Sequence, residues 1–298
     1  MASMLEFRTA GYNPYAVKYS PYYDSRVAVA SSANFGIVGN GRVFALGLTP
    51  AGIQVEKTFD TNDALYDLAW SEINENQLIV ACGDGSIKLF DLGVDKFPVM
   101  NYHEHKRETF AVCWNPITKD TFLSSSWDGT VKINRVRLAN GQAVMPAQPS
   151  EILTHDWNKY NDTIIATAGV DRNIRTFDIR NPYGGPVSLM QGHEYAVRRL
   201  AWSPHASDIL ISASYDMTVR LWTDGSTMGH NAAPPGQPMP PLGPNDPVRP
   251  GIELGLMNRH TEFATGVDWC LFGAGGWVAT VGWDERVLLW DANSLLQR

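Results

Sequence analysis

Cysteine is scarce in this sequence, and its placement argues against both disulfides and zinc. The three cysteines, Cys82, Cys113 and Cys270, lie far apart and form no Cys-x-x-Cys pair. An odd number at such spacing indicates neither a disulfide framework nor a metal site. We expect them to be small buried residues on strands, in a protein of a reducing compartment.

Excess positive charge and long apolar runs are also missing. The formal net charge is −7, whereas nucleic acids and anionic membranes select surfaces rich in Lys and Arg. No run of 18 apolar residues exists, and residues 1–8 contain no apolar core of signal-peptide length. We therefore expect a soluble protein with no nucleic-acid partner and no direct insertion into a membrane. A content of 44% hydrophobic and 18% charged residues excludes a disordered chain.

Catalytic motifs are absent as well. The sequence has no Gly-x-Ser-x-Gly, no phosphate loop ending in Gly-Lys-Ser/Thr and no His-Glu-x-x-His. We predict that the chain is not an enzyme and needs no cofactor or metal. Five histidines are expected just before the strand that opens a repeat, nearly all of them in different repeats, which favours structural hydrogen bonds over metal binding. They are His103, His105, His155, His193 and His260.

The sequence does contain an internal repeat. Asp84, Asp128, Asp171 and Asp216 recur at a period of about 44 residues. Six units are visible, the first more divergent than the rest. Each holds a strand that usually ends in Trp, a turn, a β-rich run, a tight turn with Asp, and a further strand. Short strands at even spacing predict an all-β WD-repeat β-propeller that occupies residues 1–298 as one domain.

The Asp of each repeat has a physical role. Its carboxylate can accept backbone N–H bonds in a tight turn and so fix the register of the next strand. In WD-repeat proteins it also joins a buried network with a His, a Ser or Thr and the strand Trp. His193, Asp216 and Trp222, with either Ser212 or Ser214, fit that network best.

Three irregularities modify the repeat. After Ile133 the expected Trp/Phe-Asp is replaced by Asn134-Arg135, and residues 136–149 resemble the end of another unit, so one repeat is missing there. Residues 225–251 form a Pro-rich loop insertion on the face opposite the Asp turns, before an outer strand at residues 252–257. Finally, residues 5–8 are expected to complete the last unit and close the ring.

One face of the propeller is rich in aromatic and acidic residues. Large aromatics precede the turn Asp in three units, and further aromatics and carboxylates lie in the loops that lead into the opening strands. This combination suits a peptide that is apolar on one side and cationic at its edges. The predicted binding residues are Asp63, Tyr66, Asp67, Glu108, Phe110, Trp127, Glu151, Glu194, Tyr195, Tyr215, Glu262, Phe263 and Trp283.

Several strings are more specific than the repeat itself. Generic WD-repeat proteins do not share Glu194-Tyr-Ala-Val-Arg-Arg199 or His260-Thr-Glu-Phe263. Together with residues 13–21, 61–70 and 151–160, these strings make the chain resemble the receptors for the type-2 peroxisomal targeting signal, the seventh peroxin family. The resemblance covers nearly the whole chain apart from the Pro-rich loop, and that family has seven repeats.

The resemblance implies a function. Such a receptor captures newly made matrix proteins in the cytoplasm and delivers them to the peroxisome with a co-receptor and the docking proteins of the peroxisomal membrane. Its ligand is an amphipathic cationic helix, the N-terminal nine-residue signal. The competing hypotheses are a WD-repeat scaffold subunit of a nuclear or chromatin complex and, third, an enzyme with a propeller fold.

Overall fold

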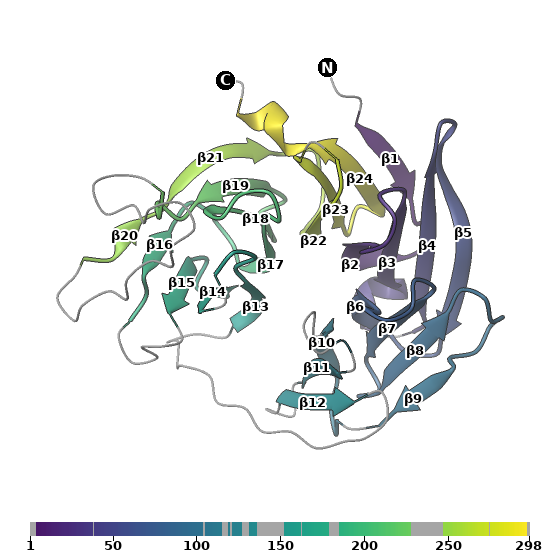
Figure 1. Ribbon diagram of the computed structural model, residues 1–298. Coiled ribbons are helices and arrows are strands. Elements are labelled where there is room, and N and C mark those ends of the chain that lie inside the picture. Colours follow the sequence, from purple (N-terminus) through teal and green to yellow (C-terminus); the bar gives the residue numbers. More distant parts are fainter. Residues whose placement is uncertain are drawn as a thin grey trace.

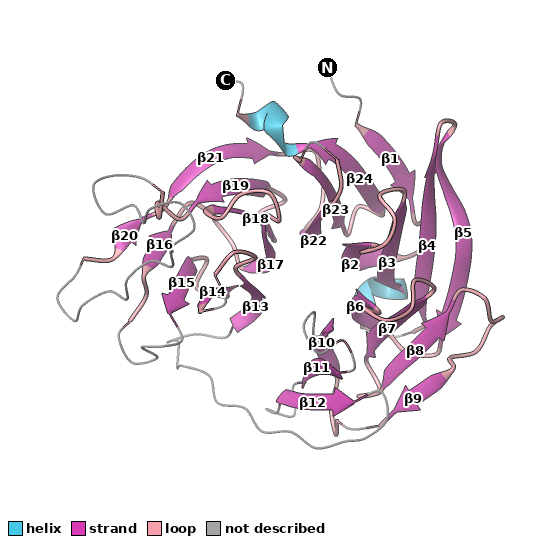
Figure 2. Cartoon of the chain, in the orientation of Figure 1, coloured by secondary structure: helices cyan, strands magenta, loops and turns pink. Residues whose placement is uncertain are grey.

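The structure is a computed structural model, and it is built almost entirely from strands. It describes residues 4–37, 39–103, 105–114, 119, 121–126, 131–135, 152–161, 163–178, 185–227, 247–273 and 275–296. Within these ranges the helical segments are two 3-10 turns, η1 (Ala33–Gly36) and η2 (Ala292–Leu295) (Figure 2). No helix in the described part of the chain is long and apolar enough to cross a membrane.

In the described part of the chain the strands form six sheets placed around a centre, as Figure 1 shows, and all their pairs are antiparallel except β16 with β20. The first three sheets follow the chain order. They are β2 (Asn13–Tyr19), β3 (Arg26–Ser32), β4 (Gly41–Thr49) and β5 (Gly52–Thr61); β6 (Leu65–Trp70), β7 (Gln77–Cys82), β8 (Ile87–Asp91) and β9 (Met100–Tyr102); and β10 (Thr109–Trp114), β11 (Thr121–Ser126) and β12 (Val131–Arg135).

Each of the other three sheets includes one strand that is separated in sequence from the rest of the sheet. They are β13 (Ile152–Trp157), β14 (Ile164–Gly169), β15 (Ile174–Asp178) and β16 (Ser188–Met190) with β20 (Arg249–Pro250); β17 (Val197–Trp202), β18 (Ile209–Ser214), β19 (Val219–Thr223) and β21 (Ile252–Met257); and β22 (Ala264–Trp269), β23 (Trp277–Gly282) and β24 (Arg286–Asp291) with β1 (Leu5–Arg8). The predicted β-propeller and the six visible repeats are confirmed.

The hydrophobic core lies between neighbouring sheets. One buried cluster joins Leu221 and Met257 of one sheet to Val267 and Trp269 of the next, and another joins Phe59 to Leu65. A sheet that has a neighbour on each side is covered on both faces, so its strands are apolar on both faces. Burying one such side chain contributes about 1.5–3 kcal/mol.

The N-terminal strand closes the last sheet, as the sequence predicts. β1 pairs with β24, with Leu5 opposite Leu289. The guanidinium of Arg286 donates to both carboxylate oxygens of Glu6, at 2.9 and 2.8 Å. The outer strand predicted at residues 252–257 is β21, which pairs with β19.

The ring is interrupted beside Ile133. The first strands of the sheets pack against one another in the order β10, β6, β2, β22, β17, β13, and Figure 1 shows the sheets β10–β12 and β13–β16 standing apart. Trp157 on β13 is 42% exposed, whereas the corresponding Trp70, Trp202 and Trp269 are 4%, 1% and 5% exposed. The missing repeat thus leaves one face of β13 uncovered.

Some expectations about single residues are wrong. His155 lies within β13 and not before it. Cys113 on β10 is exposed, and Cys270 is buried but follows the end of β22. Cys82 is buried at the end of β7, as expected. Residues 136–149 and most of the Pro-rich loop lie outside the described residues.

Candidate functional site

The best-formed repeat contains a buried hydrogen-bonded network. Nδ1 of His193 lies 2.7 Å from the Asp216 carboxylate, and Nε2 lies 2.7 Å from Ser212 Oγ. The indole N–H of Trp222 donates to the same hydroxyl at 2.8 Å. Because a carboxylate only accepts hydrogen bonds, Nδ1 carries the proton and Nε2 accepts from the serine. Ser214 instead donates to backbone carbonyls beside the turn.

Electrostatics favour the charged form of Asp216. Burial raises the pKa of its carboxyl group, but the hydrogen bonds from His193 and Thr218 outweigh burial and hold the pKa well below its ordinary value. The backbone N–H of Thr218 also donates to it, at 3.0 Å. The predicted roles of the turn Asp in the network and in the turn are therefore confirmed.

A second repeat carries the same network. His260 lies 3.1 Å from the carboxylate of Asp284 and 3.1 Å from Oγ1 of Thr280, and the indole of Trp290 donates to that hydroxyl at 3.3 Å. These networks fix the turns between the second and third strands of their sheets. The face of the ring that carries these turns and the starts of the first strands is called the Asp-turn face below.

All six first strands carry a β-bulge near their start. In each strand one residue is skipped in the pairing with the next strand. A bulge adds an unpaired residue and re-aims its side chain. Because the first strands stand around the centre of the molecule, the six bulged residues lie around that centre at its Asp-turn end, which is called the channel mouth below. They are Tyr15, Tyr66, Phe110, Leu153, Arg198 and Thr265.

Aromatic side chains meet across sheet boundaries at this channel mouth. The rings of Tyr66 and Phe110 stack, with centroids 4.4 Å apart, and Tyr15 meets Tyr66 edge to face at 5.2 Å. Trp283 lies 5.6 Å from Tyr15 and 5.1 Å from Phe263. Tyr215 and Phe35 extend this group, at 4.8 Å from Phe263 and 5.3 Å from Trp283. The result is one continuous aromatic surface over five sheets.

Arg198 is the one charged residue among the six bulged residues. It is only 4% exposed, and burial, followed by the charge of Arg199, lowers its pKa. It interacts electrostatically with Tyr15, Tyr66 and Tyr215. Its Nη2 is buried without a hydrogen-bond partner among the described residues, and so is the indole Nε1 of Trp283.

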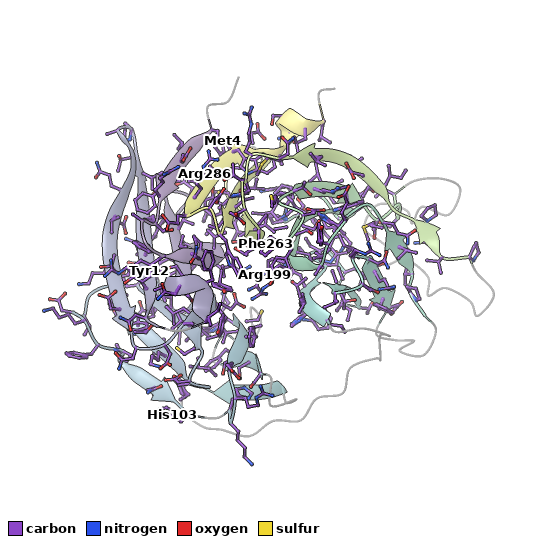
Figure 3. All side chains as sticks on the ribbon, turned by 180° about the vertical axis from the view of Figure 1, so that it is seen from behind. Met4, Tyr12, His103, Arg199, Phe263 and Arg286 are labelled. Carbon is purple, nitrogen blue, oxygen red and sulfur yellow. The ribbon has the colours of Figure 1, made fainter. Side chains whose placement is uncertain are left out.

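Ion pairs line the channel behind the aromatic surface. Asp67 lies 2.7 Å from Nη2 of Arg199, and Lys18 lies 2.9 Å from Asp268. Figure 3 labels Arg199 and Phe263, which both lie near the centre of the ring. Each carboxylate also accepts a backbone N–H from a neighbouring sheet, Asp67 from Val112 at 3.1 Å and Asp268 from Tyr19 at 2.9 Å. These contacts tie adjacent sheets together.

The predicted acidic residues fall into two groups. Asp67 is 1% exposed and both its oxygens have partners within the chain, so it lies in the channel and not on the rim. Asp63 and Glu108 are half-buried, and Glu194 and Glu262 are exposed. Burial raises the pKa of Tyr66, and Glu108 adds to this shift, which puts that carboxylate beside the aromatic surface.

Most predicted aromatic residues converge, with some differences from the sequence-based placement. Tyr66 and Phe110 are bulged strand residues and not loop residues. Tyr195 is 61% exposed on the loop before β17. Trp127 and Glu151 lie outside the described residues. Among the described residues, no group of three or more His, Cys, Asp or Glu side chains is arranged as metal ligands.

Sequence reasoning missed Tyr15, Phe35 and Arg198. Aligning the repeats on their first strands would have found two of them, because Tyr15, Tyr66, Phe110 and Arg198 each stand four residues before the aromatic residue that ends the first strand. Phe35 lies in η1, outside the repeat pattern, and no sequence feature marks it.

Comparison with known proteins identifies WD repeats, in agreement with the β-propeller, and also full-length relatives within a narrower family. The model for the WD domain, G-beta repeat, matches residues 54–91, 96–133 and 184–223. The chain is 34% identical to the peroxisomal targeting signal 2 receptor of Saccharomyces cerevisiae, over 97% of this chain and 99% of that protein. It is 36% identical to peroxisome biogenesis protein 7 of Arabidopsis thaliana, over 95% and 96%.

A third relative bears on the interrupted ring. The chain is 31% identical to the peroxisomal targeting signal 2 receptor of Schizosaccharomyces pombe, over 97% of this chain and 100% of that protein. The alignment runs over 332 positions, more than the 298 residues of this chain. Part of that relative therefore has no counterpart here.

Proposed function

This chain belongs to the family of peroxisomal targeting signal 2 receptors, and from that premise we propose that it binds the N-terminal type-2 signal of peroxisomal matrix proteins. It delivers them from the cytoplasm to the peroxisome with a co-receptor and docks on proteins of the peroxisomal membrane. The observation that carries the proposal is the full-length similarity to proteins of that name. The role is that of a binding protein, and no catalytic step is involved.

The Asp-turn face suits such a ligand. The signal has a basic and an aliphatic residue, five variable positions, then His or Gln and a small or aliphatic residue. Seven residues make nearly two helical turns, so both pairs lie on one side of a helix. The aromatic surface around Trp283 and Tyr215 provides the apolar contact, and Glu194 and Glu262 provide acidic groups beside it.

The far face has a different role in this proposal. The turn with Asp216 leads into β19, so the Pro-rich loop at 225–251 starts at the opposite end of that strand. We place the loop outside the signal site. A co-receptor then covers the side of the signal helix that faces away from the propeller and buries apolar area that the receptor alone leaves exposed.

Binding of a labelled signal peptide tests the proposal. A nine-residue type-2 signal should bind the purified chain saturably in a fluorescence-polarisation titration. The matched control is a scrambled peptide with the same composition and charge but without the helical stripe, and it should bind at least tenfold more weakly. A nuclear or chromatin scaffold would bind both peptides equally or neither, and either result would contradict the receptor role.

A further inference from the structure

Two buried hydrogen-bond donors lie at the channel mouth without an acceptor in the described part of the chain. They are Nη2 of Arg198 and Nε1 of Trp283. Both groups belong to the same aromatic surface, because Tyr15 and Tyr215 contact the Trp283 ring and interact with the Arg198 charge. Buried polar groups in folded proteins nearly always have a partner, so such a pair indicates a ligand that brings one.

The groups around Arg198 do not supply that partner. The hydroxyls of Tyr15 and Tyr66 donate to the carbonyls of Phe35 and Gly36, at 2.6 and 3.2 Å. The buried carboxylate of Asp67 attracts the Arg198 charge but is paired with Arg199. Arg198 Nη2 is therefore a buried donor with aromatic rings around it and no hydrogen-bonded carboxylate among the described residues.

The chemistry of these donors selects the ligand. A guanidinium prefers a carboxylate, which accepts charge-assisted hydrogen bonds in the plane of its fork. An indole N–H adds a second, neutral donor at the same aromatic surface. The acidic groups of Glu194 and Glu262 beside this surface weaken the binding of a free anion and favour a carboxylate carried on a molecule that is also cationic.

We infer that Arg198 and Trp283 form a carboxylate-binding subsite at the channel mouth, occupied by an acidic group of the bound peptide. The peptide then has basic residues over the acidic rim and one carboxylate directed into the channel. The inference rests on the proposed function for the identity of the peptide, and it places the carboxylate among the five variable positions of the signal.

The subsite itself is tested without any signal peptide. The indole N–H resonance of Trp283 is assigned by its loss in Trp283→Phe, and ¹⁵N-labelled protein is titrated with sodium acetate against sodium chloride at constant ionic strength. We expect a saturable shift with acetate only, at least tenfold weaker in Arg198→Met. No shift with acetate, or an equal shift in Arg198→Met, would overturn the subsite and leave water as the partner of both donors.

Two further variants keep this test valid. Arg198→Lys keeps the charge but loses the paired N–H donors of the planar guanidinium, so it should bind acetate several-fold more weakly than the parent. This variant provides the test if Arg198→Met fails to fold. Arg8→Met is the matched control, because Arg8 is exposed on β1, and it should keep the parent's affinity. An unchanged affinity in Arg198→Lys would contradict the inference.

The origin of the carboxylate is tested with capped peptides. Five pairs of peptides are compared, one pair for each variable position. In each pair one peptide carries Glu at that position and the other carries Gln, and both termini of every peptide are blocked. At one position Glu should bind at least fivefold more tightly than Gln, and Arg198→Met should abolish the difference. Equal binding at all five positions would refute the assignment to the signal. If no peptide binds while acetate still shifts the indole N–H resonance of Trp283, the proposed function fails and the subsite stands.

Discussion

A single histidine before β17 links β18 to the turn that follows it in the best-formed repeat. The sequence predicted the network of His193, Asp216 and Trp222 because its members lie in one repeat at fixed spacing. It left Ser212 and Ser214 open, because both lie on the same face of one strand. The structure selects Ser212, which faces the Trp222 indole across the sheet, whereas Ser214 lies at the turn. Distances of this kind follow from strand register, which residue types alone do not specify.

Replacing Asp216 by Asn should destabilise the protein in a pH-dependent way. The folded-state pKa of Asp216 is depressed, so its contribution is present above the unfolded pKa and is lost as pH falls through the folded value. At pH 7 the variant should lose about 2–4 kcal/mol in the free energy of unfolding, as expected for a broken buried network. Urea denaturation at pH 7 and near pH 3 measures this, and the difference should shrink at the lower pH.

Asp224→Asn is the matched control, because its shift has the opposite sign. Burial raises the pKa of Asp224 to about 6, so its charged form opposes folding above that pH. The variant should become more stable than the parent as pH rises from about 4 to about 7, by up to about 3 kcal/mol for two pKa units. If both variants changed in the same direction with pH, the network account of Asp216 would be wrong.

Single elements were predicted more accurately than their irregularities. The strand at residues 5–8 and the one at 252–257 have the bounds expected from alternation and from the need to close the ring. The six bulges were not predicted. A bulge depends on how a strand pairs with its neighbour, and the repeat alone does not show that Tyr15 or Arg198 is skipped in that pairing. The same bulges determine which side chains line the channel mouth.

The uncovered face of β13 gives a prediction about the missing repeat. Trp157→Ala should cost about 1–2 kcal/mol in the free energy of unfolding, because this side chain is already 42% exposed. Trp202→Ala, at the equivalent position of a covered strand, should cost about 3–5 kcal/mol. Equal losses in urea denaturation would show that Trp157 is buried in solution and that another surface covers β13.

At the scale of the whole molecule, the ring brings distant residues together. Tyr66 and Tyr215 come from two repeats, and Phe263 and Trp283 come from a third. The sequence predicted their convergence because equivalent positions of a propeller point to the same face. It did not predict that Asp67 would be enclosed in the channel, since its partner Arg199 belongs to a repeat across the ring. Contacts across the channel depend on the position of every sheet, which periodicity does not specify.

Variants of the Asp-turn face should lose affinity for the signal peptide in two ways that differ in their dependence on salt. Glu194→Lys and Glu262→Lys reverse exposed charges, so they should weaken binding most at low salt, because such charges are screened within about 10 Å at 0.1 M. Tyr215→Ala and Trp283→Ala remove apolar anchors and should cost about 1–4 kcal/mol of binding free energy at any salt. Peptide titrations at two ionic strengths separate the two effects.

The control for these variants is Glu75→Lys. Glu75 is exposed on the loop between β6 and β7, at the end of the sheet away from the Asp turns, so its reversal changes the net charge by the same amount without touching the binding face. It should leave affinity close to the parent at both salt concentrations. If it weakened binding as much as Glu194→Lys, attraction would come from the overall charge of −7. If both aromatic variants bound like the parent, the signal would lie elsewhere on the ring.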